Sequence, residues 1–472
     1  MAVPPAIARL DPGPTIVLAI MLWHWAGARR REARIVARDG GKEAVMQKLG
    51  RRCGSGLQAA VVGMALALLC VVFSTPVATA QKRSWDDLPV ITMHGGLQVF
   101  WNVIDNTGGE NEAQAVAHGF APVSLLNTYA DYPGRQKENI EAFVGRHSTN
   151  PWNKPAFFER IIRRNINQKP STGVYVHDIE FDFEEDVAKA WSDKAARDAS
   201  GAKDLSTFEA AYFREWASWF WLPLQWAKEK YADARVGLYG PQPFRRDYWG
   251  IADKNAAQID GTHRTDWLLW KYIDPHVDFY LASIYVFYER PESVFYMAAN
   301  VEENYTRTRE LGNKPIYAYE WLRYHESNRA LGNRELDPYL VEAMAVVPFF
   351  SGARGIVLWG YEPQLKREYP PYQTLPLYMK NLERIARLSE IIGRARVALD
   401  EPAHVAWKER RPLVRRLLVG EDECLILAIN PWQTEGATTR ADVACGKERY
   451  PVAMEGRSTT LVHIVGNRLQ AY

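Results

Sequence analysis

The chain has 472 residues, of which 47% are hydrophobic and 24% are charged, an ordinary composition for a globular protein. This length allows one large domain and one smaller domain. The formal net charge of +2 gives no electrostatic reason for a nucleic-acid partner or a membrane surface, so we expect neither.

The first 80 residues have the layout of a targeting signal. An apolar run, Gly56–Phe73, follows the basic stretch Lys48–Arg52 and precedes an Ala-x-Ala site at residues 78–80. Residues 46–80 are therefore interpreted as a signal peptide, with a mature start at Gln81.

Residues 1–45 carry no sustained pattern and are interpreted as an upstream extension, unstructured or not translated. We expect the protein to be exported, secreted or periplasmic, with no stable membrane insertion after signal cleavage. A signal-anchored protein is the alternative, because the apolar run approaches the length of a spanning helix.

After the signal, short β-branched or aromatic runs alternate with long helical patterns. The expected strands are Leu97–Val103, Val123–Tyr129, Gly173–Glu184, Arg235–Tyr239, Phe279–Val286, Pro315–Trp321 and Gly355–Trp359. The expected helices are Ala156–Arg164, Thr207–Tyr231, Pro291–Leu311, Pro338–Phe350 and Leu375–Gly393. This alternation predicts an α/β fold with parallel strands, a (β/α)8-type, TIM-like barrel or a distorted variant of it, over residues 84–398.

From residue 399 to residue 472 the pattern changes to short strands separated by turn residues. The expected strands are Ala403–Trp407, Val414–Val419, Glu423–Asn430 and Thr459–Val465. We expect a small C-terminal all-β domain, closed by a disulfide between Cys424 and Cys445. The sequence has neither metal-ligand spacing nor a Gly-rich phosphate loop, so we expect no metal and no cofactor.

In the stretch Val174–Asp186, VYVHDIEFDFEED, the even positions from 178 to 184 are all carboxylates, and the odd positions 179, 181 and 183 are apolar. A period of two is that of a strand, so Asp178, Glu180, Asp182 and Glu184 are expected on one face. Acids this close cannot all ionise cheaply, so at least one should keep its proton near neutral pH. A protonated carboxyl beside an ionised one suits glycoside cleavage, whereas a solvated edge strand is the alternative reading.

Active sites of such barrels lie at the carboxyl ends of the strands. Asp182 and Glu184 fall at that end of the third expected strand, and polar aromatics end most of the others. These are Trp101 with Asn102, then Tyr239, Tyr285, Tyr319 and Trp359. Together they predict a mouth with stacking surfaces and hydroxyl donors, which suits a sugar ring.

The chain resembles the animal and venom hyaluronidase family in several segments. In chain order these are LQVFWNV at 97–103, FDFE at 181–184 followed by Trp191, FEAA at 208–211, GLYGP at 237–241, SIY at 283–285 and GIVLWG at 355–360. The third strand is also similar to the acidic signature of the chitinase family, although His177 and Glu180 depart from that pattern. Both families use the substrate's own N-acetyl group as nucleophile.

The resemblance implies a role for each matched residue. Glu184 would be the general acid and then the base, and Asp182 would orient and support the acetamido group. Tyr285 would donate a hydrogen bond to the acetamido oxygen, with Tyr239 nearby, and Trp359 would form the wall against the N-acetyl methyl group. The remaining substrate-binding candidates are Trp101, Asn102, Tyr319, Glu180 and Glu320.

The sequence therefore predicts a secreted, retaining endo-β-N-acetylhexosaminidase, hyaluronidase-like, whose partner is a polysaccharide and which we expect to be a monomer. One alternative is a retaining glycosidase on a glycan without N-acetyl groups, with Glu320 or Glu362 as protein nucleophile. The other is an inactive glycan-binding protein. An acidic polymer would require a basic cleft, for which the candidates are Arg245, Arg246, Arg323 and Lys366.

Overall fold

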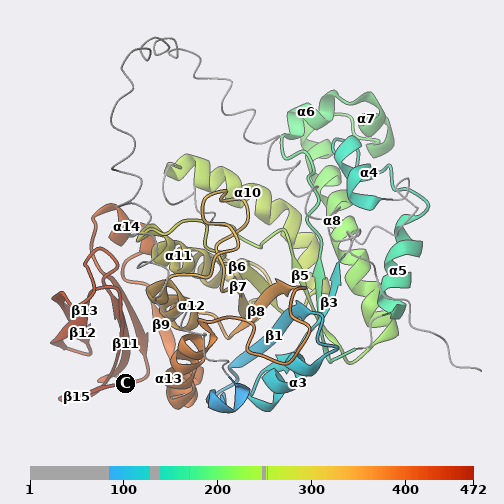
Figure 1. Ribbon diagram of the computed structural model, residues 1–472. Coiled ribbons are helices and arrows are strands. Elements are labelled where there is room, and N and C mark those ends of the chain that lie inside the picture. The colour runs from blue at the N-terminus through green and yellow to red at the C-terminus, as the bar shows by residue number, and fades with distance from the viewer. Residues whose placement is uncertain (1–83, 128–138, 169–170, 247–250, 252–253) are drawn as a thin grey trace, which may run out of the picture. The chain divides into compact units, whose positions relative to one another are not determined.

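The computed structural model describes residues 84–127, 139–168, 171–246, 251 and 254–472, all within one compact unit, Ser84–Tyr472 (Figure 1). The expected signal peptide and upstream extension lie outside these residues. Among the helices of the described residues, none combines the length and apolarity that a bilayer crossing requires.

The first part of this unit is a parallel β-barrel, as predicted. Its strands are β1 (Gln98–Asp105), β2 (Ala121–Pro122), β3 (Ser124–Asn127), β4 (Val174–Asp178), β5 (Arg235–Tyr239), β6 (Tyr280–Ser283), β7 (Ile316–Trp321) and β8 (Gly355–Glu362). The ladder β2-β1-β8-β7-β6 and the ladder β3-β4-β5 are parallel throughout. Because β2 and β3 are separated by a single residue, they act as one broken strand that joins the two ladders.

The second junction of the barrel lies between β5 and β6. Asp278 N–H donates to the Val236 carbonyl at 2.8 Å, and the Asp278 carboxylate accepts the Val236 N–H at 2.8 Å. A side chain thus replaces ladder bonds at this junction. With β2 and β3 counted as one, the described residues provide seven strand positions, a distorted variant of the eight-stranded barrel.

Helices follow the strands, and several of them cover the outside of the barrel (Figure 1). The helices are α3 (Glu110–Ala117), α4 (Ile140–Arg146), α5 (Phe158–Gln168), α6 (Val187–Ser192), α7 (Lys194–Ser200), α8 (Leu205–Lys230), α10 (Ala256–Ile273), α11 (Glu292–Arg307), α12 (Pro338–Ser351) and α13 (Leu375–Arg394). Of these, α6 and α7 pack on α8. The long helix α8 begins at Asp204, whose carboxylate accepts the Thr207 N–H at 2.8 Å and so caps it. Helix α10, which the sequence analysis does not predict, begins with a capping box formed by Asn255 and Gln258.

Strand β4 is shorter than the expected strand, Gly173–Glu184. It ends at Asp178, and only the Ile179 N–H continues the pairing, donating to the Tyr239 carbonyl at 2.9 Å. The apolar alternation continues beyond the strand, because Phe181 and Phe183 pack on aromatic side chains of α8. The period of two therefore reports a buried face here and not a hydrogen-bonded ladder.

The C-terminal part is an antiparallel sheet, which confirms the predicted all-β domain. Its strands are β9 (Arg396–Ala398), β10 (Leu413–Leu418), β11 (Glu423–Ile429), β14 (Thr459–Val465) and β15 (Arg468–Ala471), and β12 (Thr438–Cys445) pairs with β13 (Glu448–Glu455) as a hairpin. Figure 1 shows this sheet beside α12 and α13, away from α4–α7.

Two details of this part add to or correct the expectations. The disulfide Cys424–Cys445 is present and links β11 to the hairpin. The expected strand Ala403–Trp407 is wrong, because this segment forms a short helix, α14 (Ala403–Lys408). Ala403 and Ala406 are both fully buried, and their spacing of three residues places them on one helical face.

His177 of β4 is buried in the core, and neither ring nitrogen has a hydrogen-bond partner among the described residues. Burial lowers its pKa to about 3. Since the unfolded chain binds this proton near pH 6.5, the free energy of unfolding should fall by up to about 1.4 kcal/mol per pH unit between roughly pH 6 and pH 3.

We therefore expect His177→Phe to flatten this part of the acid unfolding profile. Urea unfolding of the wild type and the variant between pH 4 and pH 7 measures it. His147→Gln, at a half-buried histidine, is the control. Equal slopes for wild type and His177→Phe would show that other groups set the acid sensitivity.

Candidate active site

Three tyrosines meet at the carboxyl ends of the barrel strands. Tyr239 ends β5, Tyr319 lies in β7, and Tyr285 follows β6 by two residues. The ring centroids of Tyr239 and Tyr319 are 4.4 Å apart, and that of Tyr285 is 6.1 Å from both. Burial raises the pKa of all three well above the ordinary value, so each keeps its hydroxyl proton and can donate a hydrogen bond.

Two tryptophans form an apolar wall beside the tyrosines. Trp321 and Trp359 pair in register on β7 and β8, with ring centroids 4.8 Å apart. The Tyr285 ring lies 5.8 Å from the Trp359 ring and 6.1 Å from the Trp321 ring. Asn102 of β1 donates its side-chain N–H to the Tyr319 hydroxyl at 2.6 Å and so fixes that ring.

Asp178 supplies a carboxyl group to the same cluster. It is the last residue of β4 and pairs in register with Tyr239. Burial raises its pKa well above the ordinary value, and the negative charges of Glu180 and Glu141 raise it further. The charge of Asp178 also raises the pKa of Tyr319, and that of Glu180 raises the pKa of Tyr239, so both acids lie near the hydroxyl groups.

Glu184 lies elsewhere. Its carboxylate forms an ion pair with Lys189 and accepts the Asp186 N–H at 3.1 Å. Its backbone carbonyl accepts the Tyr212 hydroxyl of α8 at 2.7 Å, and its N–H donates to the Ser148 carbonyl at 3.0 Å. Glu184 thus lies six residues beyond the end of β4, beside the first half of α8.

Asp182 and Glu180 lie on the connection between Asp178 and Glu184. Both are exposed, while Ile179 between the first two acids is fully buried. An extended chain places residues i and i+2 on the same side, so Asp178 and Glu180 both face away from the core around Ile179. The acid pair nearest to the tyrosines is therefore Asp178 and Glu180, four residues, or two steps of the alternation, before the pair Asp182 and Glu184.

Two of the predicted substrate-binding residues face away from the site. Trp101 of β1 packs on the rings of Trp85 and Phe120, at centroid distances of 5.7 and 5.5 Å. Glu320 is fully buried and accepts the Tyr378 hydroxyl of α13, and burial raises its pKa well above the ordinary value. In each strand it is the neighbouring residue, Asn102 or Tyr319, that lies in the cluster, where the two form a hydrogen bond.

The predicted basic cleft is not seen as a set of free cations. Arg245 pairs with Glu185 and Asp266, at 2.8 and 2.9 Å, and Arg246 pairs with Glu303 at 3.0 Å. Arg323 donates to both carboxylate oxygens of Glu362, at 2.6 and 2.9 Å. Each arginine therefore faces a carboxylate, and Glu362, the expected alternative nucleophile, is held by one of them.

Sequence reasoning misses Trp321 as a member of the site, and it places Asp178 on the acidic face without giving it a role. The signal for Trp321 is its position two residues after Tyr319, on the same face of β7. The sequence gives a weaker signal for Asp178. The alternation of apolar residues and acids continues beyond Asp178, so it does not show that β4 ends at this residue.

A groove of about 450 Å³ lies outside the barrel, between α8 and α10. Its lining includes Trp221, Lys271 and His276, and it contains none of the strand-end residues. The candidate active site is therefore identified by the convergence of carboxyl, hydroxyl and indole groups, and the groove is separate from it.

No protein-family model matches the chain, and no curated protein matches its sequence. Among solved structures, the chain is similar to bee venom hyaluronidase at 16% sequence identity and a TM-score of 0.40, over 63% of this chain and 98% of that one. A bee venom hyaluronidase in complex with a hyaluronic acid tetramer gives 16% and 0.39, over 63% and 97%. The endo-1,4-beta-D-mannanase of Thermotoga petrophila gives 14% and 0.34, over 58% and 77%. At these identities the similarity concerns the fold alone.

Proposed function

We propose that the protein is a secreted, retaining glycoside hydrolase that cleaves inside a polysaccharide containing N-acetylhexosamine, with the substrate's acetamido group as nucleophile. The observation that carries the proposal is the place of Asp178, in register with Tyr239 and two residues before Glu180, beside three protonated tyrosines and an indole wall. Such a set of groups fits the ends of parallel barrel strands, where enzymes of this fold hold their active sites.

Glu180 is the proton carrier of the proposed mechanism. It protonates the glycosidic oxygen as the acetamido oxygen attacks the anomeric carbon and the bond to the leaving group breaks. In the second step the Glu180 carboxylate takes a proton from water, the water oxygen attacks the same carbon, and the bond from that carbon to the acetamido oxygen breaks, which regenerates the acetamido group with net retention. Glu180 suits this role because it is exposed, whereas Asp178 is the deeper member of the pair.

Asp178 supports the cation that forms between the two steps. Burial and the charge of Glu180 raise the pKa of Asp178 well above its ordinary value, so the two acids hold a proton between them until it is transferred to the leaving oxygen, and a negative charge then develops on the pair. That charge lies where the positive oxazolinium ring forms, which stabilises the transition state more than the ground state.

The tyrosines and the indole wall recognise the acetamido group. Tyr285 donates to the acetamido oxygen, with Tyr239 beside it at a centroid distance of 6.1 Å, and Trp359 packs against the methyl group. The competing assignment, Glu184 as acid and Asp182 as its support, uses the same chemistry on a different pair. We favour Asp178 and Glu180 because their charges act on the tyrosines.

The alternative with a protein nucleophile has less support. Glu320 points toward α13, and Glu362 is engaged by Arg323 and Gln364. A carboxylate held by a bidentate guanidinium is a weakened nucleophile, because the ion pair stabilises its charge.

Release of reducing ends from hyaluronan, chondroitin, chitin oligosaccharides, peptidoglycan and an N-acetyl-free glucan tests the function. We expect the purified protein to act on N-acetylated polymers only, and we expect inhibition by a thiazoline analogue of the cyclic intermediate. Activity on the N-acetyl-free glucan would contradict the substrate-assisted mechanism. Glycan binding without cleavage of any polymer would instead favour a binding protein.

A further inference from the structure

Two connections meet at the mouth of the barrel: residues 179–186 after β4 and residues 240–246 after β5. Their first contact is made by backbone, where the Ile179 N–H donates to the Tyr239 carbonyl at 2.9 Å. Gly240 follows with φ of +124°, and a Cβ atom there would lie 2.0 Å from the Ile179 carbonyl oxygen. No side chain fits at this position, so the start of the first connection is pressed against the second.

The second contact is an ion pair six residues further along the first connection. The Arg245 guanidinium lies 2.8 Å from the Glu185 carboxylate, Nη2 to Oε1. Glu180, the proposed acid, lies between the two contacts. Phe181 and Phe183 pack this stretch on α8. The two contacts named above are those that hold the first connection against the second, on either side of Glu180.

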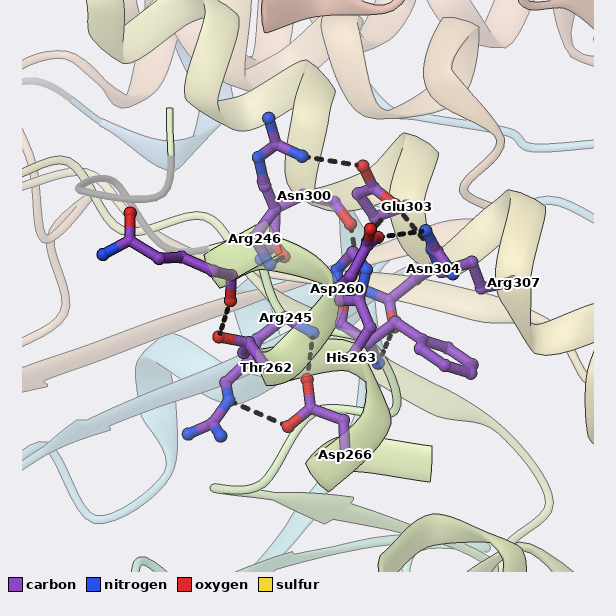
Figure 2. Close-up of polar contacts among 12 residues, drawn as sticks. Arg245, Arg246, Asp260, Thr262, His263, Asp266, Asn300, Glu303, Asn304 and Arg307 are labelled. Carbon is purple, nitrogen blue, oxygen red and sulfur yellow. Dashed lines mark hydrogen bonds and ion pairs between the residues drawn. The ribbon is translucent and has the colours of Figure 1, made fainter. Parts of the chain in front are cut away.

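Arg245 is itself fixed by Asp266 of α10 (Figure 2). One oxygen of this carboxylate lies 2.9 Å from Nε of Arg245, and the other accepts the Arg245 N–H at 2.9 Å. Asp266 is only 6% exposed, and burial raises its pKa to about 7 although Arg245 opposes the rise. Side chain and backbone of Arg245 are therefore held by the same buried group.

The rest of the second connection is tied to α11. The Phe244 N–H donates to the Asn304 side-chain oxygen at 3.1 Å. The Arg246 N–H donates to the Asn300 side-chain oxygen at 2.9 Å (Figure 2). The Asn300 side-chain N–H also donates to the Ser283 carbonyl at 2.6 Å, at the end of β6. The backbone on both sides of Arg245 is therefore held by α11, and Asn300 of α11 is in turn hydrogen-bonded to the end of β6, two residues before Tyr285.

We propose that Arg245 is a positioning residue, which through Glu185 holds the connection that carries Glu180 at a fixed place relative to Tyr239 and Tyr285. The inference rests on the proposed function, in that Glu180 is the acid. Arg245 acts on the reaction through Glu185 and touches no reacting atom. Proton delivery from Glu180 to the leaving oxygen therefore depends on the Arg245–Glu185 ion pair, at the other end of the connection 179–186.

The test compares two substrates that differ in their need for a general acid. Cleavage of the polymer releases a poor leaving group, whereas a 2,4-dinitrophenyl glycoside of the same sugar leaves without protonation. For Arg245→Met and for Glu185→Leu, we expect kcat/KM on the polymer to fall about 10- to 100-fold, as misplacement of a catalytic group by about 1 Å does. On the dinitrophenyl glycoside we expect kcat/KM to change little, because its first step needs no acid.

Further variants isolate the ion pair. Glu185→Gln keeps a hydrogen-bond acceptor and should restore most of the activity on the polymer. The double variant Arg245→Met/Glu185→Leu should lose no more than either single variant, since both remove the same tie. Arg264→Met, which breaks the exposed Arg264–Glu209 pair two residues before Asp266, is the matched control and should match the wild type.

Equal losses on both substrates, or additive losses in the double variant, would overturn the proposal, because a general loss of folding produces them. Failure of the proposed function is a separate outcome, seen as no activity of the wild type or full activity of Glu180→Gln. Amide hydrogen exchange then decides the tie alone: Arg245→Met should accelerate exchange in residues 179–186 and Arg264→Met should not. Unchanged exchange in that segment would overturn it.

Discussion

Glu180→Gln is expected to lower kcat/KM on the polymeric substrate about 10³-fold, the usual contribution of a positioned general acid. Glutamine keeps the size of the side chain but carries no transferable proton. Because Glu180 is exposed and packs into no core, folding should be unaffected. Reducing-end release by the two proteins, with thermal unfolding in parallel, measures the effect.

Glu184→Gln is the matched control for this result. It makes the same change four residues away on the same connection, at a residue paired with Lys189. We expect it to retain most of the wild-type kcat/KM. The reverse pattern, an inactive Glu184→Gln beside an active Glu180→Gln, would contradict our assignment and establish the pair Asp182 and Glu184.

The same alternation explains both the success and the failure of the sequence as a guide to this site. Apolar residues at 179, 181 and 183 correctly predict a buried face, since Phe181 and Phe183 pack on α8. They cannot show where β4 ends, because a chain lying along a helix keeps the same alternation without a hydrogen-bonded neighbour. The position of β5, which reaches only as far as Ile179, decides this point, and it comes from a segment about 60 residues later in the chain.

The alternation of side chains along a strand bears on two other predicted site residues, Trp101 and Glu320. Trp101 neighbours Asn102, and Glu320 neighbours Tyr319, so only one member of each pair can face the barrel interior. The structure places Asn102 and Tyr319 inside, where they form a hydrogen bond of 2.6 Å. The alternation alone shows that one of each pair faces outward, but identifying which one requires the register of the neighbouring strands.

Most strands and helices of the barrel can be predicted from local sequence patterns. The ion pairs between its connecting loops cannot. The expected strand Arg235–Tyr239 matches β5 residue for residue, because β-branched and apolar residues in a short run suffice to define it. The pairing of Arg245 with Glu185 and Asp266 joins residues separated by 60 and 21 positions, on a loop that no periodicity describes. The sequence singles out Arg245 only as a charge for the substrate.

A buried ion pair joins the two parts of the structure and sets the second large expected effect. Arg415 of β10 pairs with Glu302 of α11, and the two residues are 2% and 5% exposed. The other oxygen of Glu302 accepts the Ala403 N–H at 3.1 Å, so the carboxylate also holds the start of α14. Arg415→Met leaves this carboxylate buried without its guanidinium, which we expect to cost about 3–5 kcal/mol in the free energy of unfolding at pH 7.

The pH dependence of this loss identifies its cause. Burial raises the pKa of Glu302, and Arg415 opposes the rise, so the variant should raise the pKa further. The folded variant then binds a proton that the unfolded chain, with a pKa near 4.3, has lost at neutral pH. Its stability relative to the wild type should therefore be greatest below about pH 4 and should fall as the pH rises toward 8.

Two further variants separate the charge from the packing. Arg415→Met/Glu302→Gln keeps an acceptor for the Ala403 N–H without a buried charge, and it should recover most of the stability. Arg387→Met breaks the exposed Arg387–Glu383 pair of α13 and should cost less than about 0.5 kcal/mol. Urea unfolding of the four proteins at pH 5 and pH 8 makes the comparison. A loss in Arg415→Met that is as small as that in Arg387→Met, or that does not depend on pH, would mean that the two parts of the structure are held together by their apolar contacts and not by this ion pair.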